Sequence, residues 1–281
     1  MTIGIVGLGL IGASLAVAIH ENTYDTVLGL DVNENTMRAA LGQRTVDEAL
    51  SQVNISTCDM VIIALYPRAA LQVLGEIAPH VKKGAIVIDC CGIKRRICAE
   101  GKKLADQYGF TFIGGHPMAG RECWGYESAK PDLYKGASMI ITPDPEESEA
   151  PVAFVSDYFL SLGFGRITRV TAEEHDAIIA CTSQLAHVLS SSYIRSETAA
   201  RHEGLSAGSF RDMTRVAALN DRMWSEIFLD NKDNLLSEID GLIRHLQDYR
   251  DAIAEDDREA LSSMMRDSTH KRAVYFHNQM I

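Results

Sequence analysis

Positive charge is scarce in this 281-residue sequence. Its 27 lysines and arginines are outnumbered by 38 aspartates and glutamates, which gives a formal net charge of -11, and no polybasic run offsets the balance. Such a field repels nucleic-acid phosphates and anionic membrane surfaces. We therefore expect neither a nucleic-acid nor a membrane partner, and an anionic small molecule would need a local group of arginines.

Long apolar segments are missing too. Runs such as MVIIAL are far too short to cross a bilayer, and the chain opens directly on MTIGIV, which is typical of a strand rather than of a cleavable leader. We therefore expect a cytoplasmic protein. With only 7 prolines and no low-complexity tract, the composition is that of an ordered globular chain, and its length favours two domains.

Paired cysteines are also absent. The six cysteines show no CxxC spacing, and Cys90 and Cys91 are adjacent. In a chain that opens on a strand we expect them to be reduced and mostly buried. Neither the cysteines nor the nine histidines form the closely spaced ligand pairs of structural zinc sites, so we predict no metal.

The first 170 residues do contain a regular alternation of short β-rich runs and helical stretches. The β-rich runs, several of them apolar throughout, are TIGIV, TVLGLD, MVIIAL, AIVIDC, FTFIGG, SMIIT and GRITRV. Apolar strands of this kind are buried on both faces, as in a parallel sheet covered by helices. We predict an α/β fold in which residues 1–170 form a Rossmann-type, doubly wound parallel sheet.

From residue 171 onward the sequence has helical periodicity. Thr171 followed by Glu174 is a capping-box signature, and we predict an all-helical domain over residues 171–281. The expected helical stretches are 172–203, 209–250 and 251–279. Apolar residues recur at helical spacing at Leu235, Ile239, Leu242 and Leu246, where they would face a core or a partner subunit.

A glycine-rich loop follows the first strand. Gly7, Gly9 and Gly12 form a GxGxxG pattern that opens a helix, which suits a dinucleotide pyrophosphate, and Asp31 lies 19 residues later at the end of the second strand. A carboxylate there accepts hydrogen bonds from an adenosine ribose and repels a 2'-phosphate. We therefore predict NAD as the cofactor, and NADP is the less favoured alternative, left open because Arg38 is close by in the sequence.

Two further segments lie where open α/β sheets bind ligands, at the carboxyl ends of strands. VIDCCGIKR (residues 87–95) ends one strand, and GGHPMAGRE (residues 114–122) is expected to follow the next. The second segment places His116 between glycines and a proline, on what we expect to be a rigid corner.

A third segment, residues 206–224, carries two arginines. If Ser209 and Asp212 form a capping box, Arg211 and Arg215 start on one face of a helix.

These motifs together resemble prephenate dehydrogenases, the tyrosine-biosynthesis family that includes arogenate dehydrogenases. The resemblance rests on GLGLIG, GGHPMAG, SQLAH and SFRDMTR followed by NDRMW, in that order, and covers essentially the whole chain. It implies an NAD-dependent oxidative decarboxylation of prephenate to 4-hydroxyphenylpyruvate in a homodimer. It implies that His116 is catalytic and forms a hydrogen bond with the ring hydroxyl of the substrate, and that Arg215 binds a substrate carboxylate. It also implies substrate contacts from Ser183, His187, Gly208 and Trp224.

Departures and alternatives accompany the resemblance. Gly92 stands where many relatives have serine, and Arg121 where they have a small polar residue. Arogenate is an alternative substrate. A β-hydroxyacid dehydrogenase, which would need a catalytic lysine where only Lys232 is available, and a non-catalytic NAD-sensing module are less favoured. We expect His175 at the surface, and Lys94, Arg95 and Arg96 at a solvated helix start.

Overall fold

The computed structural model describes residues 1–121 and 123–276. By contacts the chain divides into two compact units, one ending at Lys232 and the other beginning at Asp233. This division lies later than the domain boundary expected between residues 170 and 171, which stays a prediction. No helix in the described ranges is long and apolar enough to cross a membrane.

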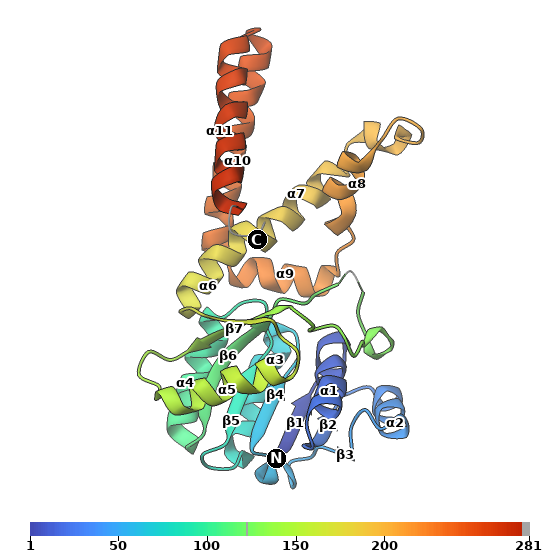
Figure 1. Ribbon diagram of the computed structural model, residues 1–281, viewed down its shortest axis with the longest axis vertical. Helices are drawn as coiled ribbons and strands as arrows, with labels where there is room; N and C mark the ends of the chain where they lie inside the picture. The colour runs from blue at the N-terminus through green and yellow to red at the C-terminus, as the bar shows by residue number, and fades with distance from the viewer. Residues whose placement is uncertain (122, 277–281) are drawn as a thin grey trace. The chain divides into compact units, whose positions relative to one another are not determined.

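The first unit is built on an eight-stranded sheet of order β3-β2-β1-β4-β5-β6-β7-β8 (Figure 1). Every predicted β-rich run forms a strand, and the two-residue β3 is an addition. The strands are β1 (Thr2–Val6), β2 (Thr26–Leu30), β3 (Glu48–Ala49), β4 (Met60–Ile63), β5 (Ile86–Asp89), β6 (Thr111–Pro117), β7 (Ser138–Pro143) and β8 (Arg166–Arg169). The α/β, mostly parallel class is confirmed, with one correction: β6 and β7 pair antiparallel.

Helices cover both faces of the sheet. They are α1 (Leu10–Asn22), α2 (Glu34–Gly42), α3 (Pro67–Ile77), α4 (Arg95–Tyr108) and α5 (Glu149–Ser161), with short 3₁₀ turns at Ile55–Thr57, Ala78–His80 and Tyr126–Ser128. One apolar core joins the sheet to α1 and α5, and a second joins it to α3 and α4. Burial on both faces explains why the strands are apolar throughout.

The GGHP segment belongs to β6 rather than following it. The expectation that His116 lies on a corner after the strand is therefore wrong. Up to Ile113 the strand pairs parallel with β5, and from Ile113 to Pro117 it pairs antiparallel with β7. The two glycines serve close packing here. A Cβ on Gly114 would lie 2.1 Å from a threonine hydroxyl oxygen, and one on Gly115 would lie 2.5 Å from the Asp89 carbonyl oxygen.

The later helices are shorter than the predicted stretches. They are α6 (Ala172–Ile179), a π-helical segment (Ala180–Leu185), α7 (Ala186–Tyr193), a 3₁₀ turn (Glu197–Arg201), α8 (Gly208–Thr214), a 3₁₀ turn (Arg215–Ala217), α9 (Asp221–Asp230), α10 (Lys232–Ala254) and α11 (Arg258–Phe276). As predicted, every regular element from α6 to the last described residue, Phe276, is helical.

The two predicted helix caps have opposite outcomes. The Thr171 hydroxyl accepts a hydrogen bond from the Glu174 backbone N–H at 3.1 Å, as expected of an N-cap. The predicted cap at Ser209 is wrong, because α8 begins at Gly208 and its N-cap residue is Ala207. The α8 helix also ends before Arg215, so Arg211 and Arg215 do not share one helix.

A buried ion pair fixes the ends of β5 and β6 to the start of α4. Lys94, expected in solvent, is fully buried with Asp89. Its ammonium donates to the Asp89 carboxylate and, at 2.6 Å, to the carbonyl oxygen of Gly115. The carboxylate also accepts from the backbone N–H of Cys91 at 2.8 Å. Burial alone would lower the pKa of Lys94, but the charge of Asp89 outweighs it, and the pKa is raised.

Replacing Lys94 should destabilise the protein strongly. The change Lys94→Met leaves the Asp89 carboxylate buried without its cation, and breaking a buried pair in this way costs about 3–5 kcal/mol of unfolding free energy. Chemical denaturation of the two proteins measures the difference.

Lys103 on the same helix provides the matched control. Its side chain is two-thirds exposed and pairs with Glu100 across one turn. Lys103→Met should therefore change the unfolding free energy by no more than about 0.5 kcal/mol. Similar small losses for both variants would mean that the buried pair contributes little.

Candidate active site

The glycine-rich loop has the geometry of a dinucleotide site. Gly7 has φ +92°, and a Cβ on Gly7 or Gly12 would lie 2.4 Å or 1.8 Å from a backbone oxygen, so neither position admits a side chain. Gly9 has open space around it and precedes the first turn of α1. The Asp31 carboxylate accepts from the backbone N–H of Leu8 at 2.8 Å, which holds it beside the loop. These residues fit a dinucleotide.

One cavity of about 470 Å³ joins this loop to several of the segments that the sequence analysis singled out. It is lined by Gly9 and the start of α1, by His116 on β6, and by residues of the π-helical segment, α7 and α9. Of the predicted substrate residues, Ser183, His187 and Trp224 lie in its wall. The volume is in the range of small-molecule sites.

His116 is part of a chain of three polar side chains. Its Nδ1 lies 2.9 Å from Nε2 of His175, and Nδ1 of His175 lies 2.7 Å from Oδ1 of Asp176. Burial, followed by the neighbouring His175 ring and the Lys94 ammonium, holds the pKa of His116 well below its ordinary value. The His116 ring is therefore neutral at physiological pH.

Another part of the cavity wall combines a histidine with a tryptophan. Nδ1 of His187 lies 2.8 Å from the carbonyl oxygen of Ser183, and the His187 ring packs against Trp224 with centroids 3.9 Å apart and ring planes tilted by 32°. Ser183 belongs to the π-helical segment. Such a segment interrupts regular α-helix and is frequent at functional sites.

Two predicted residues lie outside this wall. Gly208 begins α8 and Arg215 begins the following 3₁₀ turn; both are exposed, and neither lines the cavity. Among the described lining residues, Arg121 is the one that carries a formal charge at neutral pH, and no carboxylate is present. Glu122, the next residue, lies outside the described ranges.

Sequence analysis missed the roles of His175 and Asp176. The expectation of a surface His175 is wrong, because His175 and Asp176 are each only 1% exposed. A signal was available: Ile179 and Ala180 follow each of them by four residues, so all four lie on one helical face. The expectation of a wholly solvated helix start is likewise wrong at Lys94, whereas Arg96 is exposed.

The cysteines beside the site are unreactive. All six cysteines lie in the described part of the chain, and none of them forms a disulfide. Burial raises the pKa of Cys98 to about 12 and also raises those of Cys90 and Cys91, so these thiols stay protonated. No group of three or more metal-binding side chains occurs in residues 1–121 and 123–276.

Comparison with family models identifies two matching regions. Residues 15–168 match the nucleotide-binding domain of prephenate dehydrogenase, and residues 171–267 match the dimerization domain of the same enzyme.

Individual relatives agree with these matches. The chain is 33% identical to a cyclohexadienyl dehydrogenase of Zymomonas mobilis over 96% of this chain and 94% of that one. It is 28% identical to the prephenate dehydrogenase of Bacillus subtilis, covering 92% and 72% of the two chains. The solved structure of Synechocystis arogenate dehydrogenase superimposes with a TM-score of 0.83 at 26% identity, over 98% and 100% of the chains. The chain belongs to the prephenate dehydrogenase family.

Proposed function

We propose that the protein catalyses the NAD-dependent oxidative decarboxylation of prephenate to 4-hydroxyphenylpyruvate. The observation that carries the proposal is the meeting of His116, neutral and partly buried, with the dinucleotide loop in one cavity. Ser183, His187 and Trp224 complete the wall in which the substrate ring would lie. The proposal assigns the cavity to the ring and the Gly7–Gly12 loop to the cofactor.

The proposed reaction requires few functional groups from the protein. When bound, NAD would supply the hydride acceptor for the hydroxyl-bearing ring carbon, and the ring loses its carboxylate as carbon dioxide and becomes aromatic. Carbonyl character grows at that carbon as the hydride leaves, so a hydrogen bond from the hydroxyl to Nε2 of His116 strengthens in the transition state. The hydroxyl proton is held by this bond and remains on the phenol, which leaves no net proton to release.

The charges of the cavity favour prephenate over arogenate. The two substrates differ in the side chain, which carries a keto group in prephenate and an ammonium in arogenate. The described wall offers no carboxylate to an ammonium, and Arg121 would repel it while attracting the adjacent carboxylate. On the family resemblance, Arg215 holds a carboxylate of the substrate as well, and this assignment remains part of the proposal.

The first prediction concerns the substrate. NADH formation should proceed with a higher kcat/KM for prephenate than for arogenate, and Arg121→Gln should narrow the ratio because it removes the charge that separates the two side chains. Arg215→Ala should raise KM for both substrates by roughly 10-fold or more, as expected when a charge-assisted bond of about 1.5–3 kcal/mol is lost. Initial rates with each purified substrate measure these effects.

Arg211→Ala is the control for Arg215, because both side chains are exposed and close in sequence. It should leave KM within about threefold, as expected for a surface substitution that changes free energy by less than about 0.5 kcal/mol. If the unmodified protein uses arogenate with the higher kcat/KM, arogenate and not prephenate is its substrate. No NADH from either substrate would reject the proposed reaction.

A second prediction concerns His116. His116→Asn should lower kcat by about 10²- to 10⁴-fold, the usual contribution of a positioned acid-base group. Because the ring must be unprotonated, kcat/KM of the unmodified enzyme should fall only as the pH drops through the pKa of His116. That pKa lies well below 6.5, so the rate should stay level through pH 6.5. A decline centred at or above pH 6.5 contradicts the assignment.

A third prediction concerns the choice of cofactor. With Asp31 beside the loop, NAD should give a higher kcat/KM than NADP, since a carboxylate repels the 2'-phosphate. Asp31→Ser should narrow this gap, whereas Glu34→Gln, which removes an exposed charge in the first turn of α2, should preserve it. Equal use of the two cofactors by the unmodified enzyme would show that Asp31 does not select between them.

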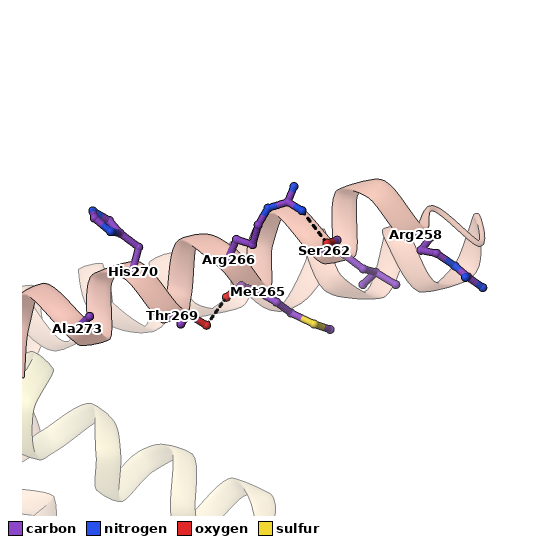
Figure 2. A pocket seen from close by; sticks show the side chains of 8 residues that line it. Arg258, Ser262, Met265, Arg266, Thr269, His270 and Ala273 are labelled. Atoms are coloured by element: carbon purple, nitrogen blue, oxygen red, sulfur yellow. Dashed lines mark hydrogen bonds between the residues drawn. The ribbon is translucent and has the colours of Figure 1, made fainter.

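We also propose a homodimer formed through the helices after Lys232. These helices leave many large apolar side chains exposed: Leu236, Ile243, Leu246, Ile253, Met265, Val274, Tyr275 and Phe276. An open groove of about 620 Å³ runs along α11, and Figure 2 shows Arg258, Met265 and His270 at separate positions along that helix. Two helices alone bury little apolar surface, so a second copy is the natural cover.

Sedimentation provides the test of the dimer. The protein should sediment at twice the 30.9 kDa mass of one chain, and Met265→Glu should shift it toward the monomer because a charge is then buried at the interface. Glu259→Gln, which alters an exposed polar side chain of the same helix, serves as the control. A protein that sediments at 30.9 kDa at working concentration contradicts the proposal.

A further inference from the structure

The Asp176 carboxylate sets the direction of every hydrogen bond between itself and the cavity. Its two oxygens accept from the backbone N–H groups of Lys94 at 2.7 Å and Arg95 at 3.0 Å, and also from Nδ1 of His175. Burial alone would raise the pKa of Asp176, but the bonds from His175 and these backbone groups outweigh it and lower the pKa. Asp176 is therefore ionised and can only accept hydrogen bonds.

The next two rings follow from that constraint. Because Asp176 only accepts, the proton on His175 lies at Nδ1, and Nε2 of the neutral His175 ring carries a lone pair. That lone pair faces Nδ1 of His116 at 2.9 Å, so His116 must donate from Nδ1. A neutral His116 ring that is protonated at Nδ1 has its own lone pair at Nε2.

Nε2 of His116 is the atom that faces the substrate region. A Cβ placed on Gly92 would lie 3.7 Å from it, and Gly92 and His116 both line the cavity. We propose that His175, oriented by Asp176, is a positioning residue that holds His116 in the tautomer with the proton on Nδ1 and the lone pair on Nε2. The consequence for catalysis rests on the function proposed above, whereas the tautomer itself is a property of the protein alone.

Burial and the Lys94 ammonium keep both rings neutral, against the effect of the nearby carboxylates on His175. Asp89 and Lys94 pair beneath them, and the Asp176 carboxylate and the Arg95 guanidinium lie on the far side of His175. The thiols of Cys90, Cys91 and Cys98 are also near Lys94, and they are protonated. Burial first, and then the Lys94 ammonium, lowers the pKa of His175 although Asp176 acts in the opposite direction. With one proton on each ring, the arrangement of donors and acceptors has a single solution.

Nitrogen NMR of the protein labelled with ¹⁵N-histidine tests the tautomer without substrate. The spectrum distinguishes protonated from unprotonated ring nitrogens, and the His116 signals are those lost in His116→Asn. His116 should be protonated at Nδ1 alone. In His175→Leu, which removes the acceptor, His116 should populate the tautomer protonated at Nε2. In His175→Gln, whose amide oxygen can accept from His116, protonation at Nδ1 should persist.

Kinetics then connects the tautomer to the reaction. His175→Leu should lower kcat by roughly 10²-fold with KM changed less than threefold, given that the wrong tautomer in a buried histidine-carboxylate pair elsewhere costs up to about 10⁴. His175→Gln should recover at least about tenfold of that loss. A substitution that merely loosens the fold would not separate the two variants in this order. His80→Leu, an exposed histidine at the end of a 3₁₀ turn, should change neither the tautomer nor kcat.

The outcomes separate this inference from the proposed function. Protonation of His116 at Nε2 in the unmodified protein, or an unchanged His116 spectrum in His175→Leu, would overturn the positioning role. If His175→Leu does not fold, the spectra of the unmodified protein and of His175→Gln still decide the tautomer. The predicted spectra without any turnover of prephenate would reject the function and leave the tautomer assignment in place.

Discussion

A single carboxylate joins the sheet to the helices that follow it. Asp176, on α6, accepts hydrogen bonds from the first backbone N–H groups of α4 and from the side chains of Arg95 and His175. The helix start needs an acceptor because the first turn of a helix leaves its N–H groups unpaired. The same oxygens orient His175, which contacts His116. One buried charge therefore caps a helix and sets the hydrogen bonding of the cavity wall.

Much of the fold could be predicted because it depends on local patterns. Strands buried on both faces are apolar throughout, and the Thr171 cap has a local signature that the structure reproduces. The strand β6 shows where such reasoning stops. Glycines suggest a turn, but Gly114 and Gly115 are required here by the close approach of neighbouring atoms where the strand changes from one partner to another. That requirement comes from residues distant in the sequence.

The site divides in the same way. His116, Ser183 and Trp224 lie in short recognisable motifs, and the structure brings them into one cavity. Lys94 and His175 were expected in solvent because polar residues next to charged ones usually are. Their burial depends on partners supplied by other elements, Asp89 at the end of β5 for one and His116 on β6 for the other. Sequence periodicity indicates which face of a helix is buried, but it does not reveal which polar side chain has a partner there.

The proximity of Lys94 to His116 suits an acceptor better than it suits a conventional base. An imidazole in water is half protonated near pH 6.5. A protonated imidazole would offer the substrate hydroxyl a hydrogen-bond donor instead of an acceptor. It would also repel the positive charge that develops on the hydroxyl-bearing carbon of the substrate. Burial and a fixed ammonium both disfavour the imidazolium. The ammonium is itself held by Asp89, so it stays charged when buried. Burial, the neighbouring His175 ring and the Lys94 ammonium together thus keep His116 neutral over the pH range in which the proposed reaction needs its lone pair.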